Sequence, residues 1–346
     1  MASTTDRDPR GLRTFLSRLM RGEDLSRAEA AELLDAVLDP QATDAQIAAA
    51  LIALKVKGET FEELAGLTEA MRHRAVRITS RHACFIDTAG TGSSRVKTFN
   101  VSTAAAFVIA GAGLAVAKHG NRAASSRCGS ADVLAALGVN VSAPAEVSEK
   151  CLNEIGICFM FAPLYHGATA RVAGVRRELG VQTTFNLLGP LTNPAHAPRQ
   201  IIGVSNPDAI EPVASALALL GTERAWVVHG ADGLDEVTIA DKTFVAEARH
   251  GEVRKFEIAP EDFGCERAGL DGLTSGDAEA NAGVIRAVLS GERRDAARAL
   301  VIVNAAVGLR VGGVARDLRA ASQVAEASID NGEARQKLDQ LVRATN

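Results

Sequence analysis

The amino-terminal part of the chain carries apolar side chains at helical spacing. They recur every three or four positions, beginning with Leu12, Phe15, Leu16 and Leu19. Ser26 and Glu29 have the spacing of a capping box, which precedes an apolar helix over Ala30–Leu38. Further helices are predicted after Asp44 and over Thr60–Met71. This part of the chain therefore predicts a small helical unit without glycine-rich loops.

Beyond Arg81 the pattern changes to short apolar runs that alternate with glycine-containing turns and helical stretches. Five runs predict β-strands: Cys84–Asp87, Ala115–Lys118, Ile157–Phe161, Ile201–Val204 and Ala225–Val228. Helical stretches such as Thr103–Ala110 and Ala209–Leu220 lie between them, which predicts an α/β fold with a mostly parallel sheet. We therefore expect a small helical domain over residues 1–77 and a large α/β domain over residues 78–346. Because ligands bind beyond the carboxyl ends of parallel strands, the turns after these strands are the expected binding loops.

Composition and charge narrow the function classes. The 346 residues are 47% hydrophobic and carry a formal net charge of −4, without the basic excess that binding to nucleic-acid phosphates requires. The five cysteines include no Cys-x-x-Cys pair, which argues against a zinc site or a disulfide framework and favours a reduced cytoplasm. Residues 1–13 are polar and no run of about eighteen apolar residues occurs, so neither a secretory signal nor a membrane span is expected.

Glycines and hydroxyl residues follow the first predicted strand, in the segment Asp87-Thr88-Ala89-Gly90-Thr91-Gly92-Ser93-Ser94. Glycine lets a backbone approach an anion closely with its N–H groups directed inward. A Gly-Thr-Gly alone is also what a tight strand exit requires, and by itself it favours that simpler interpretation. The segment is neither a Walker loop nor a dinucleotide fingerprint, because Gly-Lys-Ser/Thr and a third spaced glycine are both missing.

A second motif, Lys97–Thr103, runs directly into the next predicted helix. Ser102 or Thr103 is expected to cap this helix, whose amino terminus would present free N–H donors and a partial positive charge to phosphate. A hydroxyl at this place can also bind magnesium, which prefers hard oxygen ligands. Simple capping is the alternative interpretation, and it is compatible with binding.

A third motif, Lys118-His119-Gly120-Asn121-Arg122, ends the second strand and precedes Ala123–Ser126 and Gly129-Ser130-Ala131-Asp132. A surface turn would explain the glycines. It would not explain why Lys, His, Asn and Arg converge at the carboxyl end of a strand. Taken together, the three polar, glycine-containing turns predict a site for a polyphosphate ligand.

Three segments, Thr98–Phe107, Lys118–Arg122 and Gly129–Leu134, resemble the hallmark segments of the anthranilate phosphoribosyltransferase family. The segment Asn186–Pro194 also fits this family, Arg176 stands at a matching position, and the pair Asp235-Glu236 resembles its metal-binding acids. The likeness spans essentially the whole chain. It implies the fold class related to pyrimidine nucleoside phosphorylases and a homodimer, and helices from about residue 166 to 190 are expected to join the small domain. It also implies Mg²⁺-dependent transfer of the 5-phosphoribosyl group from phosphoribosyl pyrophosphate to the amine of anthranilate, in tryptophan biosynthesis, with two Mg²⁺ ions expected.

The resemblance also implies roles for individual residues. Those assigned to catalysis are Lys118 and Arg122, which would stabilise the departing pyrophosphate, and His119, for which a positioning role is favoured over that of a general base. Those implied to bind phosphoribosyl pyrophosphate are Gly90, Thr91, Gly92, Ser93, Ser94, Thr98, Asn100, Val101, Ser102, Thr103, Lys118, His119, Gly120, Asn121, Arg122, Ala123, Ala124, Ser125, Ser126 and Ser130. Those implied to bind anthranilate are Gly90, Asn121 and Arg176, the last through the acceptor's carboxylate. The implied metal ligands are Ser102, Asp235 and Glu236.

The chain departs from the usual pattern of this family at three places. Gly92-Ser93-Ser94 stands where the family usually has Gly-Gly-Asp, Tyr165-His166-Gly167-Ala168 replaces His-His-Pro-Ala, and Gln182 replaces an Arg. Two alternatives stay open at this point: a nucleoside phosphorylase-like enzyme on the shared fold, and a non-catalytic nucleic-acid-binding relative. The intact motifs argue against the first, and the slightly acidic charge argues against the second.

Overall fold

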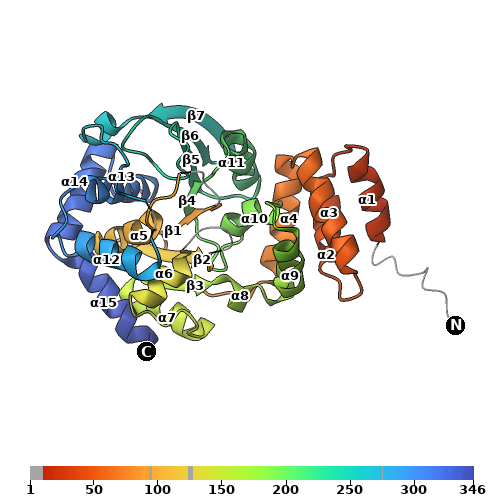
Figure 1. Cartoon of the computed structure of the whole chain (residues 1–346), viewed down its shortest axis with the longest axis horizontal. Coiled ribbons are helices and arrows are strands. Elements are labelled where there is room, and N and C mark those ends of the chain that lie inside the picture. Colours follow the sequence, from red (N-terminus) through yellow and green to blue (C-terminus); the bar gives the residue numbers. More distant parts are fainter. Residues whose placement is uncertain (1–10, 93–95, 124–127, 275) are drawn as a thin grey trace.

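A bundle of helices stands beside a seven-stranded sheet that has helices on both faces (Figure 1). This computed structural model describes residues 11–92, 96–123, 128–274 and 276–346. The helices are α1 (Leu12–Met20), α2 (Arg27–Val37), α3 (Asp44–Lys57), α4 (Phe61–Arg74), α5 (Val101–Gly111), α6 (Ser130–Ala136), α7 (Ala145–Ile155), α8 (Ala162–Tyr165), α9 (Ala170–Leu179), α10 (Phe185–Leu191), α11 (Ile210–Leu219), α12 (Ala278–Leu289), α13 (Ala296–Val311), α14 (Leu318–Asp330) and α15 (Glu333–Thr345). The strands are β1 (Phe85–Gly90), β2 (Ala115–Gly120), β3 (Ile157–Phe161), β4 (Arg199–Gly203), β5 (Arg224–Gly230), β6 (Thr243–Arg249) and β7 (Glu252–Ile258).

Capping boxes start three helices of the amino-terminal bundle. The side-chain oxygens of Ser26, Thr43 and Thr60 each accept a hydrogen bond from the backbone three residues later, and the reciprocal bond is present each time. The predicted box of Ser26 and Glu29 and the predicted cap at Thr60 are therefore confirmed. Each box satisfies two backbone N–H groups that a helix start would otherwise leave unpaired, which fixes where the helix begins.

The sheet has the strand order β3-β2-β1-β4-β5-β6-β7. The first five strands in this order are parallel, and their positions confirm the five predicted runs to within a few residues. Strands β6 and β7 pair antiparallel and were not predicted. Neither strand forms a continuous apolar run, because polar residues interrupt both. Strand β7 also lies at the edge of the sheet, where most of its residues are exposed and several are charged. The predicted α/β class with a mostly parallel sheet is confirmed.

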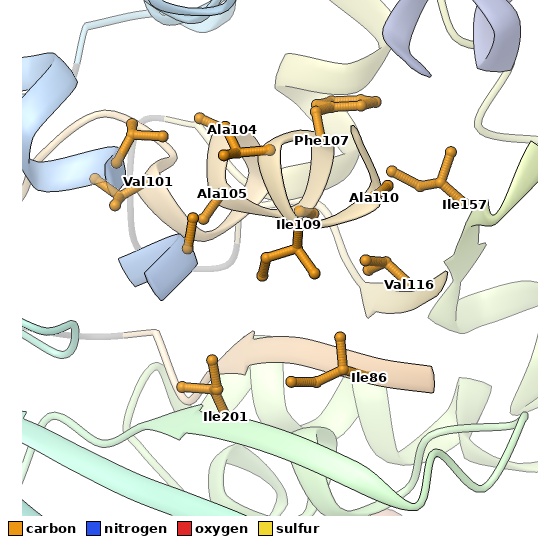
Figure 2. Close-up of a cluster of buried hydrophobic side chains, with 14 of the residues drawn as sticks. Ile86, Val101, Ala104, Ala105, Phe107, Ile109, Ala110, Val116, Ile157 and Ile201 are labelled. Atoms are coloured by element: carbon orange, nitrogen blue, oxygen red, sulfur yellow. The ribbon is translucent and has the colours of Figure 1, made fainter. Parts of the chain in front are cut away.

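Successive residues of the central strands enter two different hydrophobic clusters. Ile201 of β4 packs in one cluster, whereas its neighbour Ile202 packs in the other. In the first cluster the apolar side chains of α5 face Ile86, Val116 and Ile201 of three adjacent strands (Figure 2). Because helices cover both faces of the sheet, residues on both faces of its central strands must be apolar. The sequences of these strands are therefore continuous apolar runs.

The second cluster connects the amino-terminal bundle to the rest of the chain. It joins the buried faces of α1–α4 to Val172 and Val175 of α9, Leu188 and Leu191 of α10, and residues of α11. The bundle thus packs on the same side of the sheet as α9, α10 and α11 (Figure 1). Of the helices in the described ranges, none combines the length and apolar character that crossing a membrane would need.

Candidate active site

A cleft of about 440 Å³ lies where the carboxyl ends of the parallel strands face α9 and α10. Apart from Val101, every predicted site residue that the structure describes lines it: Gly90, Thr91, Gly92, Thr98, Asn100, Ser102, Thr103, Lys118, His119, Gly120, Asn121, Arg122, Ala123, Ser130, Arg176, Asp235 and Glu236. Val101 is buried in the hydrophobic core. The predicted residues Ser93, Ser94, Ala124, Ser125 and Ser126 lie outside the described residues. A second cavity of about 640 Å³, between α12 and α15, contains none of the predicted residues.

Lys118 is buried at the end of β2 and reaches toward β1 and α5. Its Nζ donates to the carbonyl oxygen of Thr88 and lies 3.4 Å from the hydroxyl oxygens of both Thr88 and Ser102. Burial lowers the pKa of Lys118, while the negative charges of Asp87 and Glu236 act in the opposite direction. The result is a lysine held in place by neighbouring oxygens at the floor of the cleft.

Asp87 lies close to this lysine and has no exposure to solvent. Its Oδ1 accepts from the backbone N–H of His119 (3.1 Å), and its Oδ2 accepts from Nδ2 of Asn193 (2.7 Å). The same nitrogen of Asn193 donates to the carbonyl oxygen of Ala117 (2.8 Å). Burial raises the pKa of Asp87 to about 6, although Lys118 and these hydrogen bonds act to lower it. The contacts brace the carboxyl end of β2, so its side chains enter the cleft from a well-supported backbone.

Asp235 and Glu236 belong to the loop after β5, which comes against the ends of β1 and β4. A Cβ atom at Gly203 would lie 1.7 Å from the carbonyl oxygen of Asp235, so glycine is required for this approach. The backbone N–H of Ser102 donates to Oε1 of Glu236 (3.3 Å). Burial, followed by repulsion from Asp235, raises the pKa of Glu236 to about 8.

This group of oxygens fits a magnesium ion. Two carboxylates and the hydroxyl of Ser102 are hard donors of the kind that Mg²⁺ prefers, and phosphate oxygens and water commonly complete its shell. The raised pKa of Glu236 supports the fit, because burial and then repulsion from Asp235 disfavour its charged form, and a bound cation would offset both effects. Within the described ranges, no cluster of three or more His, Cys, Asp or Glu side chains is placed to bind a metal ion, and the group described here has two carboxylates and a hydroxyl.

Asp132 connects described residues on the two sides of the segment that follows β2. Its Oδ2 accepts from the backbone N–H groups of Ala123 (3.0 Å) and Gly129 (2.9 Å), and its Oδ1 accepts from Nη1 of Arg122 (2.8 Å). Burial acts to raise the pKa of Asp132, but these hydrogen bonds outweigh it and the pKa is lowered. Asn121 accepts from the backbone N–H of Arg122 through its side-chain oxygen (2.7 Å). Asp132 therefore holds Arg122 beside the cleft in an ion pair.

Two histidines meet in the cleft, with ring centroids 5.1 Å apart and edge-to-face geometry. Burial, and then the proximity of His166, lowers the pKa of His119 to about 3, and burial lowers the pKa of His166 to about 4. The Nε2 atom of each ring is buried without a hydrogen-bond partner in the described part of the chain. Both rings are therefore neutral at pH 7.

Arg176 projects from α9 into the cleft. Its Nη2 donates to Oδ1 of Asn186 (3.1 Å), and its guanidinium carbon lies 5.6 Å from the centre of the Phe185 ring. Partial burial lowers the pKa of Arg176, and no carboxylate of the described residues contributes to the shift. Its Nε is buried without a partner in the same part of the chain. A partly desolvated guanidinium without a counter-charge is a suitable partner for a ligand carboxylate.

The amino terminus of α5 differs from the prediction. The N-cap is Asn100, so the prediction that Ser102 or Thr103 caps this helix is wrong. The side chain of Asn100 makes no capping bond because it is engaged elsewhere. Its Nδ2 donates to the carbonyl oxygen of Cys128 (3.2 Å), and its Oδ1 accepts from Nδ2 of Asn281 (3.0 Å).

Backbone N–H groups in the first turn of α5 are engaged as well. Those of Val101 and Thr103 donate to preceding backbone carbonyls, and that of Ser102 donates to Glu236. These three donors are therefore not free, contrary to the prediction. The positive end of the helix dipole and the hydroxyl of Ser102 still face the cleft.

Several residues of the site were not predicted as site residues. They are Asp87, Thr88, His166, Phe185, Asn186 and Asn193. Asp87 and Asn193, for example, are 106 positions apart and meet only in the folded chain. For Asp87 and Asn193 the available signal was a polar residue next to apolar ones, but such a residue is as often part of a turn or cap as part of a site.

Two family models match the chain. The model described as the helical bundle domain of the glycosyl transferase family matches residues 13–75, and the model described as the α/β domain of that family matches residues 82–335. The chain therefore belongs to the glycosyl transferases built from these two domains.

Within this class, the chain belongs to the anthranilate phosphoribosyltransferase family, as its motifs predicted. An anthranilate phosphoribosyltransferase from Moorella thermoacetica is 52% identical over 331 residues, covering 96% of this chain and 97% of the relative. One from Anaeromyxobacter dehalogenans is 52% identical over 333 residues, covering 95% and 97%.

Solved structures of the family share the fold. The anthranilate phosphoribosyltransferase of Thermus thermophilus matches with a TM-score of 0.90 at 39% identity, over 95% of this chain and 98% of that one. The Saccharomyces cerevisiae enzyme in complex with PRPP and Mg matches with a TM-score of 0.88 at 27% identity, over 96% and 97%. The yeast enzyme in complex with 4-fluoroanthranilate matches with a TM-score of 0.86 at 25% identity, over 96% and 97%.

Proposed function

We propose that this chain transfers the 5-phosphoribosyl group from phosphoribosyl pyrophosphate to the amine of anthranilate. The products are N-(5-phosphoribosyl)anthranilate and pyrophosphate, and the reaction belongs to tryptophan biosynthesis. The observation that carries the proposal is the distribution of charge in one cleft. Lys118 and the acidic pair Asp235-Glu236 lie on the sheet side, and Arg176 lies on the α9 side with no counter-charge from the residues that the structure describes.

On the sheet side, the three turns would bind the pyrophosphate and the ribose phosphate. Lys118 and Arg122 supply positive charge, and the hydroxyls and backbone of the turns supply hydrogen bonds. Asp235, Glu236 and Ser102 would hold magnesium, and we propose two ions because pyrophosphate offers oxygens to both. When bound, this metal would supply positive charge beside the leaving pyrophosphate.

On the α9 side, Arg176 would pair with the carboxylate of anthranilate, with Asn121 and the backbone of Gly90 completing the acceptor site. The aromatic amine is already neutral at pH 7, so it needs no general base to become a nucleophile. His119 is neutral and offers a free Nε2, which suits it to position the acceptor. The chain's contribution is therefore orientation and electrostatic stabilisation as the bond between the ribose carbon and pyrophosphate breaks.

Consumption of anthranilate, followed by its fluorescence, tests this function directly. We expect turnover only when both phosphoribosyl pyrophosphate and Mg²⁺ are present. The double variant Asp235→Asn, Glu236→Gln should need a higher Mg²⁺ concentration for half-maximal rate. An unchanged magnesium titration would rule out this metal site, and phosphorolysis of thymidine or uridine in place of anthranilate turnover would favour the nucleoside phosphorylase alternative.

The remaining expectations are also proposals. We propose a cytoplasmic homodimer and a domain boundary at residue 77, with residues 166–190 joined to the small domain. The shared hydrophobic cluster of α1–α4, α9 and α10 supports that grouping. Met20 on α1 is 80% exposed, and Val56 on the adjacent α3 is 82% exposed, which supports a contact of a second copy with these two helices.

A further inference from the structure

Asn186 makes two hydrogen bonds through one atom. Its Oδ1 accepts from Nη2 of Arg176 (3.1 Å) and from the backbone N–H of Thr183 (3.0 Å). The first bond fixes a guanidinium, and the second closes the turn that leads from α9 to α10. One side-chain oxygen thus couples the position of the cleft cation to the backbone that carries α10.

The guanidinium of Arg176 is contacted on two sides, and the residue lines the cleft. Asn186 accepts from Nη2, and the Phe185 ring lies against the guanidinium at 5.6 Å, while Nε is buried without a partner in the described part of the chain. An Arg can pair with a carboxylate through two parallel N–H groups. The hold from Asn186 therefore orients the cation while leaving donors available for such a pair.

The identity of residue 186 matters because an amide and a carboxylate have the same shape but different charge. A neutral amide oxygen accepts a hydrogen bond without cancelling the charge of the guanidinium. Aspartate at this position would form an ion pair with Arg176 at the same distance, and a ligand carboxylate would then meet a neutralised site and a like charge.

We propose that Asn186 is a positioning residue for acceptor recognition: its amide oxygen orients Arg176 toward the acceptor's carboxylate and leaves the cation unpaired. This inference rests on the proposed function and adds a determinant of specificity to it. Arg176 contacts the acceptor, and Asn186 acts through Arg176.

Steady-state kinetics of Asn186→Asp and Asn186→Ala test the proposal. Asn186→Asp should raise the KM for anthranilate by more than about tenfold, the scale of one charge-assisted hydrogen bond, and leave the KM for phosphoribosyl pyrophosphate within about twofold. Asn186→Ala should raise the KM for anthranilate by a smaller factor, because it removes the hold but adds no competing charge. Asn206→Asp makes the same chemical change at an exposed turn and should match the wild type.

A double-mutant cycle separates positioning from general damage. In the Arg176→Ala background, Asn186→Asp should change kcat/KM for anthranilate by less than about twofold, because the residue it acts through is gone. Equal increases in both KM values, or an undiminished effect in that background, would overturn the proposal. If Asn186→Asp does not fold, an unchanged anthranilate KM in Asn186→Ala overturns it instead. Absence of anthranilate turnover by the wild type would count against the proposed function itself, and is thereby distinguishable from failure of this inference.

Discussion

Two arginines show how charge compensation separates a binding residue from a structural one. Nε of Arg224 donates to Oε1 of Glu247 (2.7 Å), which also accepts from the indole of Trp226 (2.9 Å). Arg176 is only partly buried, and it pairs with a neutral amide instead. Because burying an unpaired charge is costly, its retention at Arg176 points to a ligand that supplies the missing charge.

Arg176→Ala should raise the KM for anthranilate far more than the KM for phosphoribosyl pyrophosphate. Loss of a charge-assisted contact costs roughly 1.5–3 kcal/mol, which corresponds to about a ten- to hundredfold change. Initial rates over a range of each substrate measure both constants. Arg177→Ala, at an exposed neighbouring position outside the cleft, is the matched control, and equal effects on the two substrates would contradict the assignment.

His166 should make folding stability depend on pH. Burial lowers its folded-state pKa from 6.5 to about 4, so the folded protein disfavours the protonated ring. The contribution of neutral His166 to the free energy of unfolding is complete above about pH 6.5. It is lost progressively as the pH falls toward 4, and the loss reaches about 2 to 3 kcal/mol.

Urea unfolding of the wild type and of His166→Asn between pH 7 and pH 4 measures this contribution. The stability of the wild type should fall more steeply than that of the variant, because acidic groups that titrate in both proteins cancel in the comparison. Parallel curves would show that His166 is not held neutral by the fold.

At the scale of elements, the site depends on how closely backbone segments approach. Gly90 and Gly203 are register partners at the carboxyl ends of β1 and β4, and the Asp235 loop packs against both. Parallel strands bring their carboxyl ends to the same edge of a sheet, and small residues there let a loop carrying acidic side chains come within reach of the helix amino terminus at Ser102.

Gly203→Ala should therefore displace the Asp235 loop. The added Cβ would lie 1.7 Å from the carbonyl oxygen of Asp235, so the loop must move and the acidic pair with it. A displacement of about 1 Å at a catalytic site costs on the order of a hundredfold in rate. We expect the variant to require a higher Mg²⁺ concentration as well. Rates and magnesium titrations provide the measurement.

Gly174→Ala in α9 is the control, because no atom lies within 4 Å of a Cβ added there. It should keep wild-type rates. A Gly203→Ala enzyme with normal rate and magnesium response would show that the approach of this loop is not critical.

At the scale of the whole molecule, the cleft takes its walls from both parts of the chain. Met71 of α4 lines it together with residues of α9, α10 and the sheet. Helix α1 lies on the side of the bundle away from the sheet (Figure 1), and the exposed Met20 and Val56 belong to α1 and α3. An interface there would leave the cleft open to substrates.

Val56→Glu should shift the proposed homodimer toward monomer, because it places a charge in an apolar contact. Sedimentation velocity at several protein concentrations measures the change. Val314→Glu makes the same substitution at an exposed position between α13 and α14, away from the bundle, and should leave the association state unaltered. A wild type that is monomeric at all concentrations would contradict the dimer proposal.

The sequence by itself determined the helices of the bundle, the parallel strands and the three polar turns. Capping residues, apolar periodicity and glycine placement act over a few neighbouring residues, so their effect can be inferred without the fold. Strands β6 and β7 were not predicted because polar residues interrupt their apolar runs. The cap of α5 was misassigned because the partners of Asn100 at Cys128 and Asn281 are set by distant parts of the chain.

Only the tertiary structure decided which polar residues act together. It placed Asp87 and Asn193 beside Lys118 and brought the Asp235 loop against Gly203. It also placed Arg176 beside Asn186, with no counter-charge among the described residues. Burial and electrostatic compensation depend on everything within a few ångströms of a group in space. Local sequence patterns carry no information about such neighbours, and the chemistry of this cleft depends on them.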